Sequence, residues 1–148
     1  MGGELKPNIT APEKVSVKEQ KEGKIVRVLL AEDNDALRGM YKENLEAMGY
    51  EVEAVANGLL LLNKLKTSKF DVVVTDNEMP IMTGIDALKD ISLIEGTKPR
   101  VIIITLNCSP EIRKEIEKYG GVYISKSQAP NGFYEEIGKV IEKIDQPD

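Results

Sequence analysis

The stretch VVVTDNEMP, residues 72–80, runs from β-branched residues directly into a carboxylate. Val72, Val73 and Val74 predict a strand buried on both faces, because such strands are continuously apolar rather than alternating. Asp76 follows within two residues, and a charged group beside a buried strand needs either a partner or access to solvent. The stretch therefore predicts a central strand whose end opens onto a polar site.

Outward from this strand, short β-rich runs alternate with longer segments whose apolar residues recur at helical spacing. The predicted strands are 25–31, 51–56, 71–75, 100–106 and 121–125, and the predicted helices are 37–48, 59–66, 85–94, 110–119 and 133–144. Apolar strands separated by helices imply a parallel sheet covered on both faces, with right-handed crossovers. We predict an α/β fold, a three-layer sandwich.

One domain is expected for a chain of 148 residues, since domains are most often about 100–150 residues long. Residues 1–24 are rich in Lys, Glu and Pro and lack periodicity, which predicts a flexible leader or linker. We expect residues 25–145 to form the domain and residues 146–148 to be a short tail.

Composition excludes several classes of protein. No apolar run approaches the roughly 20 residues that cross a bilayer, and the N-terminus lacks a signal-peptide pattern. The single cysteine, Cys108, favours a reducing compartment, so we expect a cytoplasmic protein without a membrane segment. A net charge of -5 argues against direct binding of nucleic acid. The chain has no histidine, which excludes Ser-His-Asp or Cys-His catalysis, histidine metal sites and a phosphohistidine carrier.

Polar side chains stand where four of the predicted strands end. Glu32 and Asp33 follow the first strand, Asp76 the third and Lys126 the fifth, while Thr105 lies at the end of the fourth. In open parallel sheets, functional groups gather beyond the carboxyl ends of the strands. Three carboxylates held together repel one another unless a cation neutralises them, and oxygen ligands suit Mg²⁺. A carboxylate is a known nucleophile for forming an aspartyl phosphate, and a hydroxyl and an ammonium can contact the phosphoryl oxygens.

Each of these residues also has a purely structural explanation. Glu32 and Asp33 can belong to a helix N-cap with acids in its first turn, and Asp76 can be a turn residue. Thr105 can be an ordinary strand residue and Lys126 a surface charge. Their joint placement at the ends of four different strands favours a functional site.

From about residue 25 to residue 144, the chain resembles the receiver domain of two-component response regulators. The motifs that carry the resemblance are LLAEDN at 29–34, VVVTDNEMPIMTG at 72–84, ITLN at 104–107 and YISK at 123–126. The resemblance implies a flavodoxin-like receiver fold with the strand order 2-1-3-4-5. It implies a phosphorelay switch that assists its own phosphorylation and dephosphorylation, rather than an enzyme. A histidine kinase or histidine phosphotransfer protein would act upstream, and a downstream protein would bind the 110–144 face.

The resemblance also implies an acceptor and a metal site. By position, Asp76 matches the phosphoacceptor of the family. Asp33, Asp76 and the backbone carbonyl of Glu78 match direct ligands of Mg²⁺, whereas Glu32 would act largely through water. These four residues are the expected magnesium site.

Further roles follow from the same resemblance. Thr105 and Lys126 match the hydroxyl and the lysine that assist phosphoryl transfer. Tyr123 matches the aromatic switch residue, which would turn inward once Thr105 moves toward a phosphorylated acceptor. Glu78 and Asn107 match positions that tune phosphoryl lifetime, since they flank the path of attacking water.

Two departures from the family pattern and two alternatives remain. Leu106 replaces a small residue and Ser127 replaces a proline, so a cis peptide after Lys126 is not assumed. Both changes leave open an interaction module that keeps the fold without being phosphorylated. The other alternative is a Mg²⁺-dependent phosphohydrolase with an aspartate nucleophile. Such enzymes usually carry a second Asp two residues after the nucleophile, where this chain has Glu78.

Overall fold

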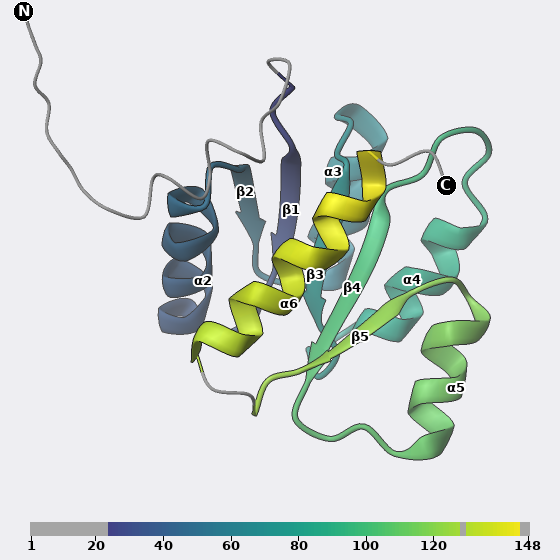
Figure 1. The fold of residues 1–148 in the computed structure, drawn as a ribbon. Coiled ribbons are helices and arrows are strands. Elements are labelled where there is room, and N and C mark those ends of the chain that lie inside the picture. The colour runs from purple at the N-terminus through teal and green to yellow at the C-terminus, as the bar shows by residue number, and fades with distance from the viewer. Residues whose placement is uncertain (1–23, 128–129, 146–148) are drawn as a thin grey trace, which may run out of the picture.

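The computed structural model describes residues 24–127 and 130–145 (Figure 1). Its elements in chain order are β1 (Arg27–Ala31), α2 (Asp35–Ala47), β2 (Glu51–Val55), α3 (Gly58–Thr67), β3 (Val72–Asp76), α4 (Gly84–Ser92), β4 (Arg100–Thr105), α5 (Pro110–Lys118), β5 (Val122–Ser125), α6 (Pro130–Glu142) and the 3-10 turn η3 (Lys143–Asp145). Apart from Lys24, the predicted leader lies outside the described residues, as does the predicted tail.

The five strands form one parallel sheet in the order β2-β1-β3-β4-β5, as predicted. The order reverses beside β1, which has β2 on one side and β3 on the other. Ala31 pairs with Thr75 across β1 and β3, and Thr105 pairs with Ser125 across β4 and β5. The carboxyl ends of these strands therefore lie at one edge of the sheet, and the residues that follow them meet there.

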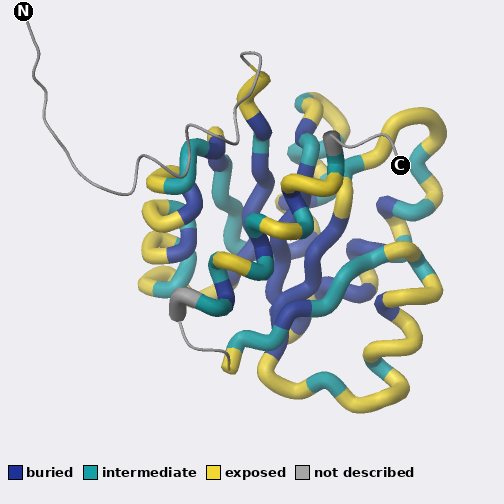
Figure 2. The backbone as a smooth tube through the Cα atoms, in the orientation of Figure 1, coloured by how far each residue is buried: buried dark blue, intermediate teal, exposed yellow. Residues whose placement is uncertain are grey.

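Helices cover both faces of the sheet, which confirms the three-layer sandwich (Figure 1). In β3, Val72 and Val74 pack into a cluster with α2 and α6, whereas Val73 packs into a cluster with α3, α4 and α5. Every residue of β3 is buried, and Figure 2 shows the buried backbone running through the middle of the molecule. Full burial of one such side chain contributes about 1.5–3 kcal/mol, so the central strand is firmly anchored.

The strand ends differ from the predictions by one or two residues, for identifiable reasons. β1 begins at Arg27 rather than at Ile25, which is exposed. β3 includes Asp76, because the next amide, that of Asn77, still donates to Ile104 O at 3.1 Å. β4 ends before Leu106, whose side chain is exposed.

Most helices begin earlier than the first apolar residue suggested, because capping residues start them. Side chains of Asn34, Asn57, Thr83 and Ser109 accept hydrogen bonds from backbone amides at the starts of α2, α3, α4 and α5. α6 begins at Pro130, three residues before the predicted start. The described residues contain no cis peptide bond, so Lys126 and Ser127 are joined in trans. No helix within these ranges has the length and apolarity of a membrane span.

Candidate functional site

The acidic cluster lies where β1 and β3 end side by side. One carboxylate oxygen from each of Glu32, Asp33 and Asp76 lies within 4.8 Å of the others. The parallel pairing of Ala31 with Thr75 forces this approach, because Glu32 and Asp76 are the next residues of each strand. Glu32 is 1% exposed and Asp76 is 4% exposed, while Asp33 faces solvent. Two of the three acids are therefore largely removed from water.

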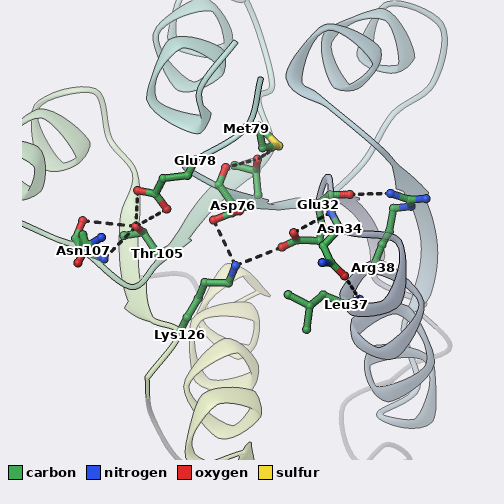
Figure 3. A network of polar contacts seen from close by, with 11 residues as sticks. Glu32, Asn34, Leu37, Arg38, Asp76, Glu78, Met79, Thr105, Asn107 and Lys126 are labelled. Atoms are coloured by element: carbon green, nitrogen blue, oxygen red, sulfur yellow. Dashed lines mark hydrogen bonds and ion pairs between the residues drawn. The ribbon is translucent and has the colours of Figure 1, made fainter. Parts of the chain in front are cut away.

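Lys126, which follows β5, forms ion pairs with two of these carboxylates (Figure 3). Its Nζ lies 3.4 Å from Glu32 Oε1 and 3.4 Å from Asp76 Oδ1, and its backbone amide donates to Thr105 O. Burial alone would lower the pKa of Lys126, but the carboxylates of Asp76 and Glu32 outweigh burial and raise it. The ammonium is thus held in its charged form between two buried carboxylates.

One ammonium does not balance the charge of three carboxylates, and the pKa of Asp76 is shifted as a result. Burial, then the charge of Glu32, raise the pKa of Asp76 to about 6 even though Lys126 opposes the shift. Asp76 Oδ1 is buried and has no hydrogen-bond partner, keeping only the long ion-pair contact with Lys126. An unsatisfied buried oxygen beside two further carboxylates fits a hard divalent cation that prefers oxygen ligands. The cluster is therefore compatible with a Mg²⁺ site.

Contacts that sequence reasoning missed hold the acidic loop in place. Arg38, one turn into α2, donates to Glu32 O at 2.8 Å and to Asp35 Oδ1 at 2.6 Å. The amide of Asn34 donates to Glu32 Oε2 at 3.1 Å, which turns that carboxylate inward. The six-residue separation of Arg38 from Glu32 matches no standard motif, so only the fold reveals the contact.

Asn77 anchors the start of the loop that follows β3. Asn77 is buried, its side chain accepts from Ile85 N at 3.0 Å and its carbonyl accepts from Gly84 N at 3.0 Å. Farther along, Ile81 has a φ of 75° and is 78% exposed, an unfavourable conformation for a β-branched residue. The sequence signalled a loop here but not that Asn77 would organise it.

Thr105 and Asn107 meet Glu78 beside Asp76 (Figure 3). The buried hydroxyl of Thr105 lies 2.9 Å from Glu78 Oε1 and 2.8 Å from Oε2. The amide of Asn107 donates to Thr105 Oγ1 at 3.3 Å. Among the described residues, the Thr105 hydroxyl makes no hydrogen bond to Asp76, so the structure brings it to the loop carboxylate instead.

Tyr123 lies within β5, three residues before Lys126. It is half-buried in β5, opposite Ile103 in the register, and packs with the α3, α4 and α5 cluster. The guanidinium carbon of Arg113 lies 5.6 Å from its ring centroid, within range of a cation–π contact. Thr105 and Tyr123 project to the same face of the sheet, because Thr105 and Ile103 are two residues apart in one strand.

Comparisons with known proteins agree with this geometry. The family model of the response regulator receiver domain matches residues 28–137. The chain belongs to the response regulator receiver family. Chemotaxis protein CheY of Thermotoga maritima is 32% identical over 115 residues, which cover 77% of this chain and 96% of that protein.

Solved receiver structures have the same fold. The chemotaxis response regulator CheY4 of Vibrio cholerae matches with a TM-score of 0.70 and 29% identity, covering 78% of this chain and 98% of that one. TrrA of T. maritima, in complex with Mg²⁺ and BeF, matches with a TM-score of 0.67 and 26% identity, covering 78% of this chain and 99% of that one.

The predicted family and fold are confirmed. As a receiver domain, the protein is a phosphoaccepting signalling switch of two-component systems rather than a conventional enzyme. The roles of individual residues stay predictions.

Proposed function

We propose that Asp76 is the residue on which this receiver domain takes up its phosphoryl group. The observation that carries the proposal is a buried carboxylate oxygen without a hydrogen-bond partner, at the end of the central strand and beside Lys126. With a pKa of about 6, Asp76 is mostly ionised at neutral pH and so is available as a nucleophile. Of the acids in the cluster, Asp76 is the one that lies within a strand, the fully buried β3.

The upstream donor is a phosphohistidine of a histidine kinase or a histidine phosphotransfer protein. A carboxylate oxygen of Asp76 attacks phosphorus, the new P–O bond forms as the P–N bond breaks, and the leaving imidazole keeps the electron pair and takes a proton from solvent. Because such donors are made from ATP, the proposal places the protein in the cytoplasm. Residues 1–148 contain no histidine, so the phosphohistidine that acts as donor lies outside them.

The surrounding residues have distinct proposed tasks. Lys126 neutralises a phosphoryl oxygen, and Thr105 donates a hydrogen bond to another. Asp33, Asp76 and the carbonyl of Glu78 would hold Mg²⁺, and Glu32 would act through water. Mg²⁺, when bound, supplies charge neutralisation for the phosphoryl oxygens.

These groups also let the domain assist its own phosphorylation and dephosphorylation. Glu78 and the backbone amide of Asn107 both hydrogen-bond to Thr105, and in the proposal they flank the path of water toward a phosphorylated Asp76. In the proposal, they therefore set how long the phosphoryl group survives. The side chain of Glu78 is exposed, which gives it room to act on that water.

We place the output on the 110–144 face, formed by α5, β5 and α6. Movement of Thr105 toward a phosphorylated Asp76 would let Tyr123 turn inward, away from Arg113, and change the surface that a partner protein binds. The shared face of Thr105 and Tyr123 supports this route. The phosphohydrolase alternative is not favoured, because Glu78, in place of a second catalytic Asp, is engaged with Thr105.

Acetyl phosphate with Mg²⁺ tests the acceptor directly. Intact-mass measurement should show one added phosphoryl group in the wild type and in Asp90→Asn, which changes an exposed carboxylate on α4 outside the cluster. The adduct should be lost in Asp76→Asn. A wild type that forms no Mg²⁺-dependent adduct, or an adduct that persists in Asp76→Asn, would refute the proposal.

A further inference from the structure

The hydrogen bond between Glu78 and Thr105 joins an exposed carboxylate to a fully buried hydroxyl. Both carboxylate oxygens lie within 2.9 Å of Thr105 Oγ1. A carboxylate has no proton to give, so the hydroxyl must be the donor. The bond is charge-assisted and belongs to the stronger class of protein hydrogen bonds.

Thr105 has only one proton to donate. Its oxygen accepts from the amide of Asn107 at 3.3 Å, and the carbonyl of Asn107, at 3.4 Å, is a more distant acceptor than either oxygen of Glu78. Phosphoryl oxygens, like carboxylate oxygens, only accept hydrogen bonds from it. A phosphoryl group on Asp76 and the carboxylate of Glu78 therefore compete for one donor.

Local structure confines this competition to the Glu78 side chain. Asn77 is held through its backbone and its side chain, and Met79 is buried with its sulfur 3.9 Å from Thr75 Oγ1. Glu78, between these two anchored neighbours, is exposed. Its carboxylate can leave Thr105 by side-chain rotation alone, without movement of the loop backbone.

We propose that Glu78 is a latch that holds the Thr105 hydroxyl in the unphosphorylated protein and is displaced when a phosphoryl group occupies Asp76. Because the ligand must break the Glu78–Thr105 bond to gain Thr105, the latch weakens binding at Asp76 and keeps Thr105 in one rotamer until then. Glu78 is thus a positioning residue, and the latch depends on the proposed acceptor role of Asp76.

The charge of Glu78 alone would also disfavour an anionic ligand, so the test must separate charge from the hydrogen bond. Glu78→Asp keeps the charge but withdraws the carboxylate by one C–C bond, about 1.5 Å, which takes it beyond hydrogen-bond reach of Thr105. Thr105→Val removes the hydroxyl and nearly keeps the shape. Together these variants form a double-mutant cycle.

Calorimetric titration with beryllofluoride in the presence of Mg²⁺ measures the cycle. We expect Glu78→Asp to tighten binding by about tenfold in the Thr105 background, as for loss of a competing charged hydrogen bond, and by less than about twofold in the Thr105→Val background. No gain in the first background, or equal gains in both, would overturn the latch while leaving Asp76 as the acceptor. Failure of the wild type to bind beryllofluoride would overturn the acceptor role and the latch with it.

A second measurement needs neither metal nor phosphoryl analogue. Three-bond NMR couplings to the Thr105 methyl group report its χ1 rotamer. We expect one rotamer in the wild type and averaging over more than one in Glu78→Asp, with Asp90→Asn unchanged from the wild type. An identical rotamer population in the wild type and Glu78→Asp would overturn the holding role of Glu78.

Discussion

Gly84 offers a sharp test of how tightly the loop around Asp76 is built. A Cβ at Gly84 would lie 2.5 Å from Asp76 O and 3.1 Å from the Cα of Asn77, and both are backbone atoms. Backbone of the central strand cannot move aside as the tip of a flexible side chain can. We therefore expect Gly84→Ala to force α4 away from the end of β3.

The magnitude follows from two opposing effects. In a helix, Ala is normally favoured over Gly by roughly 1 kcal/mol, whereas overpacking a tight site costs about 1–3 kcal/mol. A contact of 2.5 Å lies well inside normal van der Waals separation, so the overpacking cost should exceed the propensity gain. We expect Gly84→Ala to lower the free energy of unfolding by about 1–2 kcal/mol.

Gly39 is the matched control, because it lies within α2 and a Cβ there would meet nothing within 4 Å. Gly39→Ala should raise the free energy of unfolding by about 0.5–1 kcal/mol. Urea denaturation followed by circular dichroism measures both variants, with the m-value checked for constancy. If Gly84→Ala proves as stable as Gly39→Ala, the close approach of α4 to Asp76 is not a structural constraint and the reasoning fails.

Two further predictions concern the charges of the site. The pKa of Asp76 is raised from 3.8 in the unfolded chain to about 6 in the folded protein. Protonated Asp76 therefore contributes stability that is fully present below pH 3.8 and is lost as the pH rises through about 6. Without Mg²⁺, Asp76→Asn should thus be more stable than the wild type at pH 7 by on the order of 1–2 kcal/mol, after allowance for solvent screening. Urea titrations should show this difference in unfolding free energy shrinking toward pH 4. Equal differences at pH 7 and pH 4 would contradict the prediction. Mg²⁺ should raise the melting temperature of the wild type. In thermal melts, Asp33→Asn should abolish that rise, whereas Asp35→Asn should keep it. A rise that survives in Asp33→Asn would argue against the proposed ligand set.

What sequence could predict depends on whether a feature is fixed by the backbone of the strands. Asp76 is the last residue of β3, and Glu32 and Lys126 directly follow β1 and β5, so the parallel sheet brings all three to one edge. Their place at a common edge was therefore predictable from periodicity, whereas the strand order came from the resemblance to receiver domains. Helix starts were predicted less well, because Asn34 and Thr83 begin helices through capping contacts that precede the first apolar residue.

Contacts made by loops and rotamers could not be predicted in the same way. Arg38 reaches back to Glu32 O across a helix start, and Asn77 closes its loop with a side-chain amide. The bond from Thr105 to Glu78 depends on two χ angles and on where the loop after β3 turns. The resemblance to receiver domains marked Glu78 as a tuning position, but not as a partner of Thr105 before any ligand arrives.

This division within the site has a functional consequence. Asp76 and Glu32 are buried at the edge of the sheet, so changes there alter folding stability and phosphoryl acceptance together. Glu78 is exposed and makes its contact by rotamer choice, so it can change without a large effect on stability. Acceptance of the phosphoryl group is thus tied to the fold, whereas the threshold at which Thr105 responds can vary through a single surface carboxylate. A receiver domain built in this way can be retuned without being destabilised.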